Sequence, residues 1–293
     1  MNDGVFIKKI KGETWDKFID ENVAYLDDIL TYGQYLVGIN NEKKYNEKYQ
    51  STIILLFCEL LETVDGIKSL IAGNSFGVCK ILLRQLIEIT SYLTYILSDK
   101  NLIKERSLAY QINQSKDSIK SYRVLRNKSV DNIEKTHWDG AIKNLENMFK
   151  KSDYSQIVKQ WNKNNQLPWF GISNGNKNLR DLLKDLNLEP VYDLYRALCP
   201  KSHGADAMSS INVDKNGNIL LMNPKHPYDI ESILTGIAIC AQFTFVKFIT
   251  NYLEAEDMVN YIQWETNNEK EKNRLIEQWG HFKDIYIYEL HIK

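Results

Sequence analysis

Apolar residues recur every three or four positions along most of the chain, which is the spacing that places them on one face of an α-helix. In the first such segment Trp15, Phe18 and Leu26 fall on one side. The segments with this pattern are residues 13–38, 43–72, 76–97, 101–126, 129–150, 176–186, 190–198, 228–255 and 256–280. We expect each of them to be helical. The segment 76–97 has few polar residues, so it is expected at the centre of the core.

One segment predicts β-structure instead. Residues 210–222 contain two short apolar runs on either side of Asn216-Gly217, the dipeptide most typical of a two-residue hairpin turn. The whole pattern therefore predicts a predominantly α protein, a helical bundle of about 8–10 helices with one small β-hairpin.

The chain shows no internal repeat, no proline-rich linker and no low-complexity tail, so we expect a single helical domain over residues 1–293. The many charges of residues 101–150 predict a protruding helical hairpin with solvated faces. The Asn- and Gly-rich residues 162–178 predict a loop. We expect its aromatic pair, Trp169 and Phe170, to pack against the body of the protein and hold the loop there.

Composition limits the classes of partner. The net charge of −1, from 37 basic and 38 acidic side chains, provides no long-range attraction to nucleic acid or to an anionic membrane. Residues 233–252 are strongly apolar but contain Gln242 and Lys247, so we expect a buried core helix and no membrane span.

The cysteines indicate a reducing compartment. None of the four forms a Cys-x-x-Cys pair, and Cys58, Cys79 and Cys240 lie in apolar helical stretches, where a free thiol behaves as a small hydrophobic group. We therefore expect no disulfide, no zinc site and a cytoplasmic location. Richness in Asn, Lys, Ile and Tyr is typical of a bacterial protein from an AT-rich genome.

The common motifs of phosphate-binding loops, zinc proteases and serine hydrolases are absent, and no two histidines lie close together. We expect no metal and no cofactor. The first candidate feature is Arg84 and Glu88, four residues apart in an otherwise apolar segment. Two buried charges must be paired and hydrogen-bonded, so this pair either organises the core or lines a pocket. The acidic residues that could join it are Glu59, Glu62 and Asp65.

The second candidate feature is the segment 192–204. Arg196 and His203 are seven residues apart, which is two turns of an unbroken helix. Pro200 is expected to kink or end the helix, and Ser202 could cap the segment after it. An arginine and a histidine at a helix break can bind a phosphate and move a proton near neutral pH. Alternatively, Ser202 and His203 merely satisfy loop backbone groups.

Several of these residues carry a family resemblance. The helix LLRQLIEITSYLTYIL (82–97), Trp169-Phe170-Gly171, and the segment Tyr192…Tyr195-Arg196…Ser202-His203 resemble the bacterial domain-of-unknown-function family 5677. The resemblance covers roughly residues 45–255. It implies an all-helical domain and no settled activity.

A second resemblance concerns the spacing from Arg196 to His203, which is similar to the Arg-x(4–6)-His motif of the HEPN superfamily. It implies a metal-independent RNA endonuclease of toxin or phage-defence type, acting as a homodimer with RNA as substrate and an antitoxin or defence protein as partner. Arg196 would hold the phosphate, and His203 would act as acid–base or orienting residue. The supporting residues would be Arg84, Glu88, Tyr195 and Ser202. The chain departs from the motif at Ala197, where a polar residue is usual, and at Pro200.

Two alternatives stay open. The protein could be a non-catalytic helical protein that binds a ligand or a partner protein, with Arg84–Glu88 and Arg196–His203 as structural polar networks. It could also be a small-molecule enzyme that uses the same residues.

Overall fold

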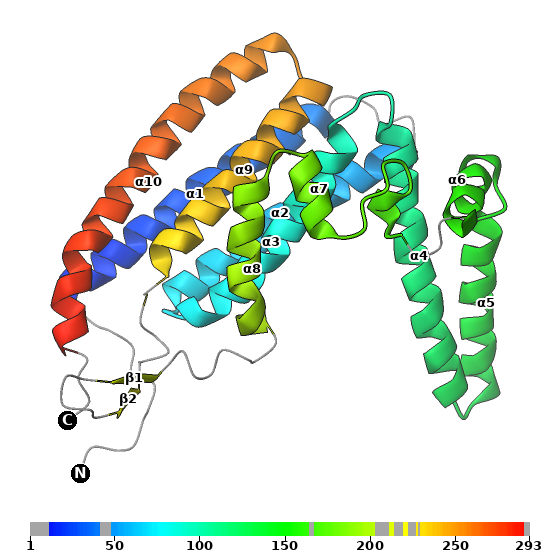
Figure 1. Cartoon of the computed structure of the whole chain (residues 1–293), viewed down its shortest axis with the longest axis horizontal. Helices are drawn as coiled ribbons and strands as arrows, with labels where there is room; N and C mark the ends of the chain where they lie inside the picture. Colours follow the sequence, from blue (N-terminus) through cyan, green and yellow to red (C-terminus); the bar gives the residue numbers. More distant parts are fainter. Residues whose placement is uncertain are drawn as a thin grey trace. The chain divides into compact units, whose positions relative to one another are not determined.

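The computed structural model describes residues 12–41, 48–163, 167–202, 211–213, 219–221, 227 and 229–289, and the side chains of 12–39, 49–163, 167–199, 227 and 229–280. Over these residues the protein is predominantly α-helical (Figure 1). The helices are α1 (Glu13–Asn41), α2 (Lys48–Ala72), α3 (Phe76–Leu97), α4 (Ile103–Lys128), α5 (Asn132–Met148), α6 (Ser152–Lys163), the 3-10 helix η1 (Trp169–Gly171), α7 (Leu179–Asp185), α8 (Glu189–Ser202), α9 (Ile230–Tyr252) and α10 (Ala255–Glu289).

The predicted helical class is confirmed, and three details differ from expectation. Helix α6 was not predicted, although its buried residues Tyr154, Ile157 and Trp161 follow the helical spacing of three and four positions. Helix α10 continues well beyond residue 280. Helix α8 runs through Pro200 and ends two residues later, at Ser202; of the two effects expected of the proline, an end at position 200 is wrong and a kink there stays a prediction. A proline in the last turn removes only the one hydrogen bond that its missing N–H would make.

Strands β1 (Ile211–Val213) and β2 (Ile219–Leu221) pair antiparallel, with Asn212 opposite Leu220. The Asn216-Gly217 turn between them lies outside the described residues and stays a prediction.

The chain forms two compact units. Unit 1 contains Met1–Lys44, Leu56–Ser91 and Glu189–Lys293, and unit 2 contains Tyr45–Leu55 and Tyr92–Leu188. Two of the boundaries, after Leu55 and after Ser91, fall within helices α2 and α3. This division does not decide the prediction of one domain, because two compact units can still unfold as one cooperative body.

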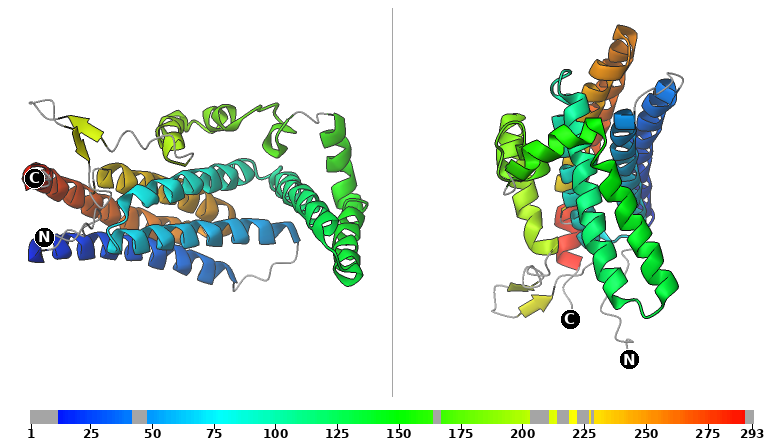
Figure 2. Two further views of the ribbon diagram at one scale, coloured as in Figure 1. Left: turned by 90° about the horizontal axis from the view of Figure 1, so that it is seen from below. Right: turned by 90° about the vertical axis from the view of Figure 1, so that its right-hand side faces the viewer.

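Helix α9 forms the centre of unit 1. It lies beside α1 and α10 in every view (Figures 1 and 2), and its buried residues cover more than half of its circumference, with Ser232 and Phe243 on the exposed side. The ring centroid of Phe248 lies 4.6 Å from that of Phe57 on α2. By length and composition α9 could also cross a membrane, as the one such helix in the described ranges, but 61% of its apolar window is buried inside the protein. The core helix of a globular protein has the same character.

The turn between α2 and α3 shows how the sequence ends a helix. Asn74 adopts a left-handed conformation with φ of 54°, which asparagine tolerates better than most residues. Its buried side chain accepts a hydrogen bond of 2.9 Å from Nε1 of Trp15 at the start of α1. The turn that ends α2 thus also anchors the first helix.

The cysteines only partly follow expectation. Cys79 and Cys240 are buried, whereas Cys58 is exposed. Position 58 follows the fully buried Phe57, and one residue along a helix turns the side chain by about 100°. An apolar neighbourhood in sequence therefore did not place Cys58 in the core.

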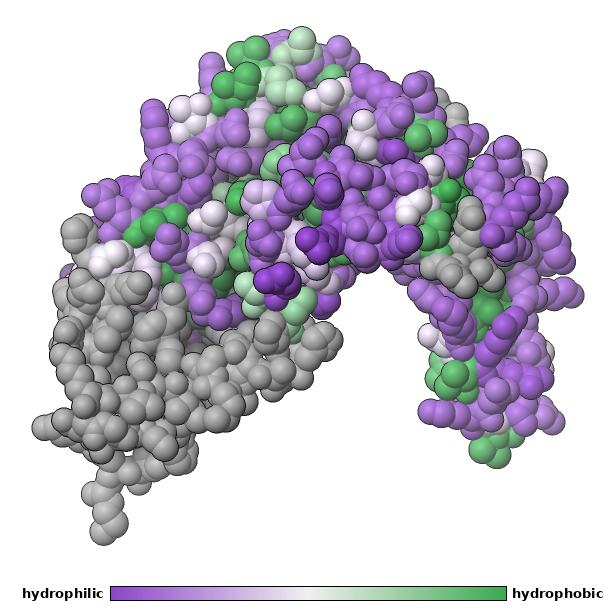
Figure 3. Space-filling model, in the orientation of Figure 1, coloured by the Kyte–Doolittle hydropathy of each residue, from purple (hydrophilic) through white to green (hydrophobic). Residues whose placement is uncertain are grey.

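In unit 2, α4 and α5 form a helical hairpin joined by a short turn (Figure 1). No residue of α5 is buried. Ion pairs tie the two helices, Arg123 to Glu146 at 2.9 Å and Arg126 to Asp139 at 3.0 Å. Hydrophilic residues cover most of this hairpin (Figure 3), in agreement with the expectation from its composition. Val130, in the turn between the two helices, is an exposed aliphatic residue.

The loop aromatics Trp169 and Phe170 are buried within unit 2, as predicted. Trp169 packs edge-on against Tyr110, with ring centroids 5.2 Å apart. Nearby, Arg106 is buried and donates to the backbone carbonyl of Tyr95 and, at 2.7 Å, to Oγ of Ser98. These acceptors lie at the C-terminal end of α3, where the helix dipole stabilises a cation.

Candidate functional site

Helix α8 is held on unit 1 by its apolar face. Val191 and Leu198 are buried, and Leu194 lies between them on the same side of the helix. At the contact with α9, Gly236 has no side chain, and a Cβ there would lie 2.9 Å from Leu83 and 3.0 Å from Leu194. The glycine therefore permits the side chains of α3 and α8 to approach α9 closely.

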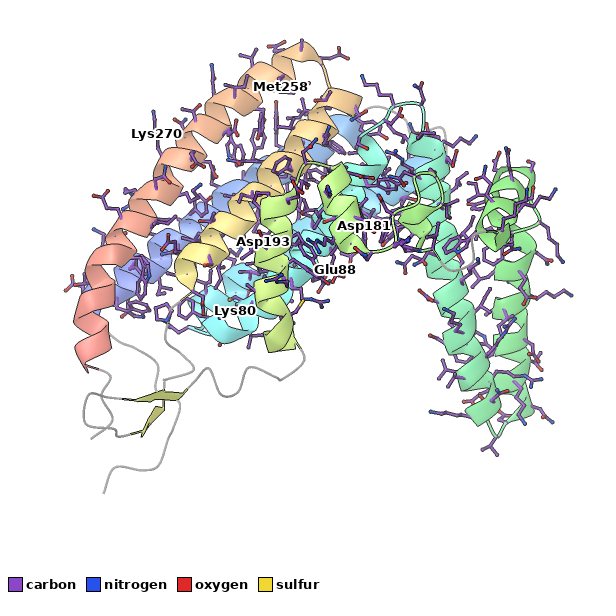
Figure 4. All side chains as sticks on the ribbon, in the orientation of Figure 1. Lys80, Glu88, Asp181, Asp193, Met258 and Lys270 are labelled. Atoms are coloured by element: carbon purple, nitrogen blue, oxygen red, sulfur yellow. The ribbon has the colours of Figure 1, made fainter. Side chains whose placement is uncertain are left out.

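Helix α3 presents three charged residues to this region at successive four-residue intervals, Lys80, Arg84 and Glu88. This spacing places them on one face. Figure 4 labels Lys80 and Glu88 on α3, and Asp193 on the neighbouring α8. Lys80 forms an ion pair of 2.6 Å with Asp229 at the start of α9, so its charge is matched.

Arg84, Glu88 and Tyr195 form one hydrogen-bonded cluster, the Arg84–Tyr195–Glu88 network. Nη2 of Arg84 donates to the Tyr195 hydroxyl at 2.5 Å, and that hydroxyl donates to Oε1 of Glu88 at 2.8 Å. The same Nη2 lies 3.1 Å from Oε1 of Glu88. The guanidinium carbon is 4.8 Å from the centroid of the Tyr195 ring, within the range of a cation–π contact. The network therefore joins α3 to α8 through hydrogen bonds to charged groups and through a cation–π contact.

The acidic partners predicted for Arg84 were wrong. Glu59 and Glu62 are exposed, and Asp65 pairs with Lys68 at 2.7 Å. The partner that completes the cluster is a phenol from a helix more than a hundred residues away. The side chains of Arg84 and Glu88 are 25% and 30% exposed, so the pair lies at the edge of the core.

Burial and charge both act on the ionisation of this network. The pKa of Tyr195 is raised to about 12 by burial, by the hydrogen bond to Glu88 and by the negative charge of Glu88. The positive charge and hydrogen bond of Arg84 lower this pKa, but by less. Burial alone would lower the pKa of Arg84, but hydrogen bonds to Cys199 and Tyr195 and the charge of Glu88 raise it overall. Tyr195 is therefore a neutral hydroxyl, and Arg84 a fixed cation, across the physiological pH range.

The remaining predicted site residues lie elsewhere. Arg196 follows Tyr195 on α8 but is exposed and takes no part in the network. Ser202 is the last residue of α8, with its side chain outside the described residues, and His203 lies outside them altogether. The structure thus brings Arg84, Glu88 and Tyr195 together, while the convergence of Arg196 with His203 stays a prediction.

With this geometry established, comparisons place the chain in a family. Residues 50–219 match the family of unknown function DUF5677, which is more than half of the 293 residues. The chain belongs to DUF5677. The matched region contains the Arg84–Tyr195–Glu88 network, Arg196 and the α4–α5 hairpin. Searches among curated proteins and among solved structures found no match.

Tyr192 and Cys199 lie in the segment 192–204 singled out from the sequence, but neither was predicted as a site residue. The ring of Tyr192 stacks on that of Tyr195, with centroids 6.3 Å apart and an interplanar angle of 26°. Cys199 donates to the backbone carbonyl of Tyr195 at 3.4 Å and takes part in the hydrogen bonding of Arg84. Their positions, three before and four after Tyr195, are the signal that could have grouped them.

The described part of this DUF5677 member holds no group of three or more His, Cys, Asp or Glu side chains placed to bind a metal. A groove of about 290 Å³ lies between α8 and α9. It is lined by Pro190, Val191, Leu194, Glu231, Ser232, Thr235, Gly236 and Ile239. The groove and Arg196 occupy different faces of α8, since Val191 and Leu194 pack inward and Arg196 is exposed.

Proposed function

We propose that this protein is a metal-independent RNA endonuclease of toxin or phage-defence type, similar to HEPN proteins. Arg196 holds the phosphate of the RNA backbone, and His203 acts as the acid–base. The supporting observation is that Arg196 is exposed on a helix that continues to Ser202. An exposed guanidinium is accessible to a phosphate, whereas a buried one would be paired within the chain.

The continuity of α8 bears on the Arg-to-His spacing. The helix is unbroken from Arg196 to the residue before His203, so Pro200 does not interrupt the first six steps of that spacing. The reaction needs no cofactor. The base removes the proton of the ribose 2′-hydroxyl, the 2′-oxygen bonds to phosphorus, and the bond to the 5′-oxygen breaks as that oxygen gains a proton. Arg196 stabilises the charge that develops on the phosphate oxygens.

Neighbouring carboxylates on α8 reduce the positive potential around Arg196. Glu189 and Asp193 are exposed on α8, and Asp193 lies three residues before Arg196. Like charge near a phosphate weakens its binding. Replacing Asp193 with Asn is therefore expected to strengthen RNA binding, which is the opposite of what removal of a structural side chain would do.

The first experiment is induction of the wild type, Arg196→Ala and His203→Ala in a bacterial host, with and without phage infection, followed by analysis of total RNA and growth. We expect RNA cleavage and growth arrest with the wild type and neither with the two variants. Lys184→Ala, which removes an exposed cation on α7, serves as the control and should behave as wild type. Purified protein incubated with RNA then tests whether cleavage continues in the presence of a chelator. An intact RNA profile with the wild type in all of these conditions contradicts the proposal.

A second candidate function is non-catalytic binding of a ligand or partner protein. It is favoured by the groove between α8 and α9 and by the Arg84–Tyr195–Glu88 network, whose three side chains are hydrogen-bonded or ion-paired with one another. This candidate predicts that Arg196→Ala and His203→Ala leave the RNA profile and growth unchanged relative to the wild type. The proposed partners of the nuclease are RNA, a second copy of the chain and an antitoxin or defence protein, and the proposed location is the cytoplasm.

A further inference from the structure

An aromatic side chain precedes Arg196 by one helical turn. Tyr192 and Arg196 are four residues apart on α8, which separates them by about 6 Å along the axis and about 40° around it. Tyr192 is half-buried and Arg196 exposed. The two side chains therefore lie next to each other at the border between the packed and the exposed sides of α8.

The ring of Tyr192 is held in place by its neighbours. It stacks on Tyr195 with ring centroids 6.3 Å apart. The hydroxyl of Tyr195 in turn accepts from Arg84 and donates to Glu88, at 2.5 Å and 2.8 Å. A ring that is fixed before binding loses little conformational entropy when a second ring stacks on it. By fixing Tyr195, the Arg84–Tyr195–Glu88 network therefore also orients Tyr192 beside Arg196.

We infer that Tyr192 is a stacking platform for an unpaired base next to the phosphate held by Arg196, so that the substrate is single-stranded RNA. This inference rests on the proposed function. Proteins that bind single strands combine cations along the backbone with aromatic rings on which bases stack. In a duplex the bases are stacked on one another, and proteins reach mainly the backbone and the 2′-hydroxyls of the shallow groove. A platform of this kind selects single strands without reading their sequence.

The test measures binding of three fluorescent RNA probes to the full chain. The probes are a mixed-sequence single strand, the duplex of that strand, and the same single strand with abasic sites in place of several bases. Both the wild type and His203→Ala are used, so that cleavage does not obscure binding. We expect the single strand to bind more tightly than either other probe.

Variants of Tyr192 separate stacking from packing. Tyr192→Leu should weaken binding of the intact single strand by roughly 5- to 100-fold, since base–aromatic stacking is worth about 1–3 kcal/mol per base. It should leave the affinity for the abasic strand almost unchanged. Tyr192→Phe and Tyr192→Trp keep a ring and should retain wild-type affinity, which a loss of packing alone would not explain. Tyr35→Leu, at an exposed tyrosine of α1, is the control and should bind all probes as the wild type does.

The outcomes separate the inference from the proposed nuclease. RNA cleavage by the wild type together with equal affinity of Tyr192→Leu for intact and abasic strands overturns the platform and leaves the nuclease standing. Equal binding of duplex and single strand also overturns it. Binding that depends on the base and on the ring at position 192, without cleavage, supports the platform and overturns the nuclease. Absence of both binding and cleavage overturns both.

Discussion

Tyr195→Phe is the most direct perturbation of the Arg84–Tyr195–Glu88 network. It removes one oxygen and leaves the ring that contacts Arg84 and Tyr192. The lost oxygen makes two hydrogen bonds to charged groups, at 2.5 Å and 2.8 Å. Hydrogen bonds of this type contribute about 1.5–3 kcal/mol each.

The net effect is smaller than the sum of the two bonds. In the variant, Arg84 and Glu88 still form their ion pair, which is 3.1 Å long in the wild type. Their side chains are 25% and 30% exposed, so water can replace the lost hydrogen bonds. Neither charge is left buried and unpaired, which is the situation that is most destabilising. We therefore expect Tyr195→Phe to lower the free energy of unfolding by about 1–2 kcal/mol.

The assay is urea denaturation followed by far-UV circular dichroism, with Tyr35→Phe as the control. Tyr35 is exposed and its ring contacts that of Tyr32 in a tilted arrangement, so loss of its hydroxyl should change the free energy of unfolding by less than about 0.5 kcal/mol. Glu88→Gln and the double variant complete a thermodynamic cycle, in which the coupling between Tyr195 and Glu88 should be at least about 0.5 kcal/mol. Equal stability of Tyr195→Phe and the wild type, or additive effects in the cycle, would refute the role given to the hydroxyl.

The remaining predictions concern packing, a buried cation and ionisation. Gly236→Ala should destabilise the protein by about 1–3 kcal/mol, because its Cβ would lie 2.9 Å from a buried leucine. Gly140→Ala, where nothing lies within 4 Å in mid-helix α5, should stabilise it by about 0.5–1 kcal/mol in the same denaturation assay. Arg106→Gln should lower the melting temperature and speed amide exchange at the end of α3, because two acceptors lose a charged donor; unchanged exchange there would contradict its capping role. The pKa of Tyr195 is raised from 10.0 to about 12, so its stabilising contribution should be fully present below pH 10 and lost as the pH rises through about 12. Alkaline titration of stability in wild type and Tyr195→Phe checks this, since the gap between the two should close only above pH 10.

Periodicity identified most helices because their apolar faces are encoded locally. The segments 13–38 and 76–97 correspond to α1 and α3 almost to the residue. The same spacing is present in α6, where Tyr154, Ile157 and Trp161 are buried, although that helix was not predicted. It gave no warning that α8 continues past Pro200, where the packing of Val191 and Leu198 within unit 1 holds the helix. Local preference is readily overridden when tertiary contacts bury an apolar face.

The candidate site was only partly accessible to sequence reasoning. The four-residue spacing of Arg84 and Glu88 in an apolar segment marked them as a pair that needed partners. The partner, Tyr195, was recognised as a supporting residue through family resemblance, while the proposed acids on α2 were wrong. No local pattern specifies which side chain 111 positions away supplies the hydrogen bond, because that pairing depends on how α8 packs on α3.

By itself, the sequence determined the helical class, the position of most helices and the pairing of charges along one face of α3. Each follows from contacts within a few residues, where spacing translates directly into geometry. Only the tertiary structure decided that Tyr195 bridges Arg84 and Glu88, that Tyr192 stacks on it, that Arg196 faces solvent and that Cys58 is exposed. These features depend on which faces of distant helices are buried against each other, and burial is a property of the packed chain.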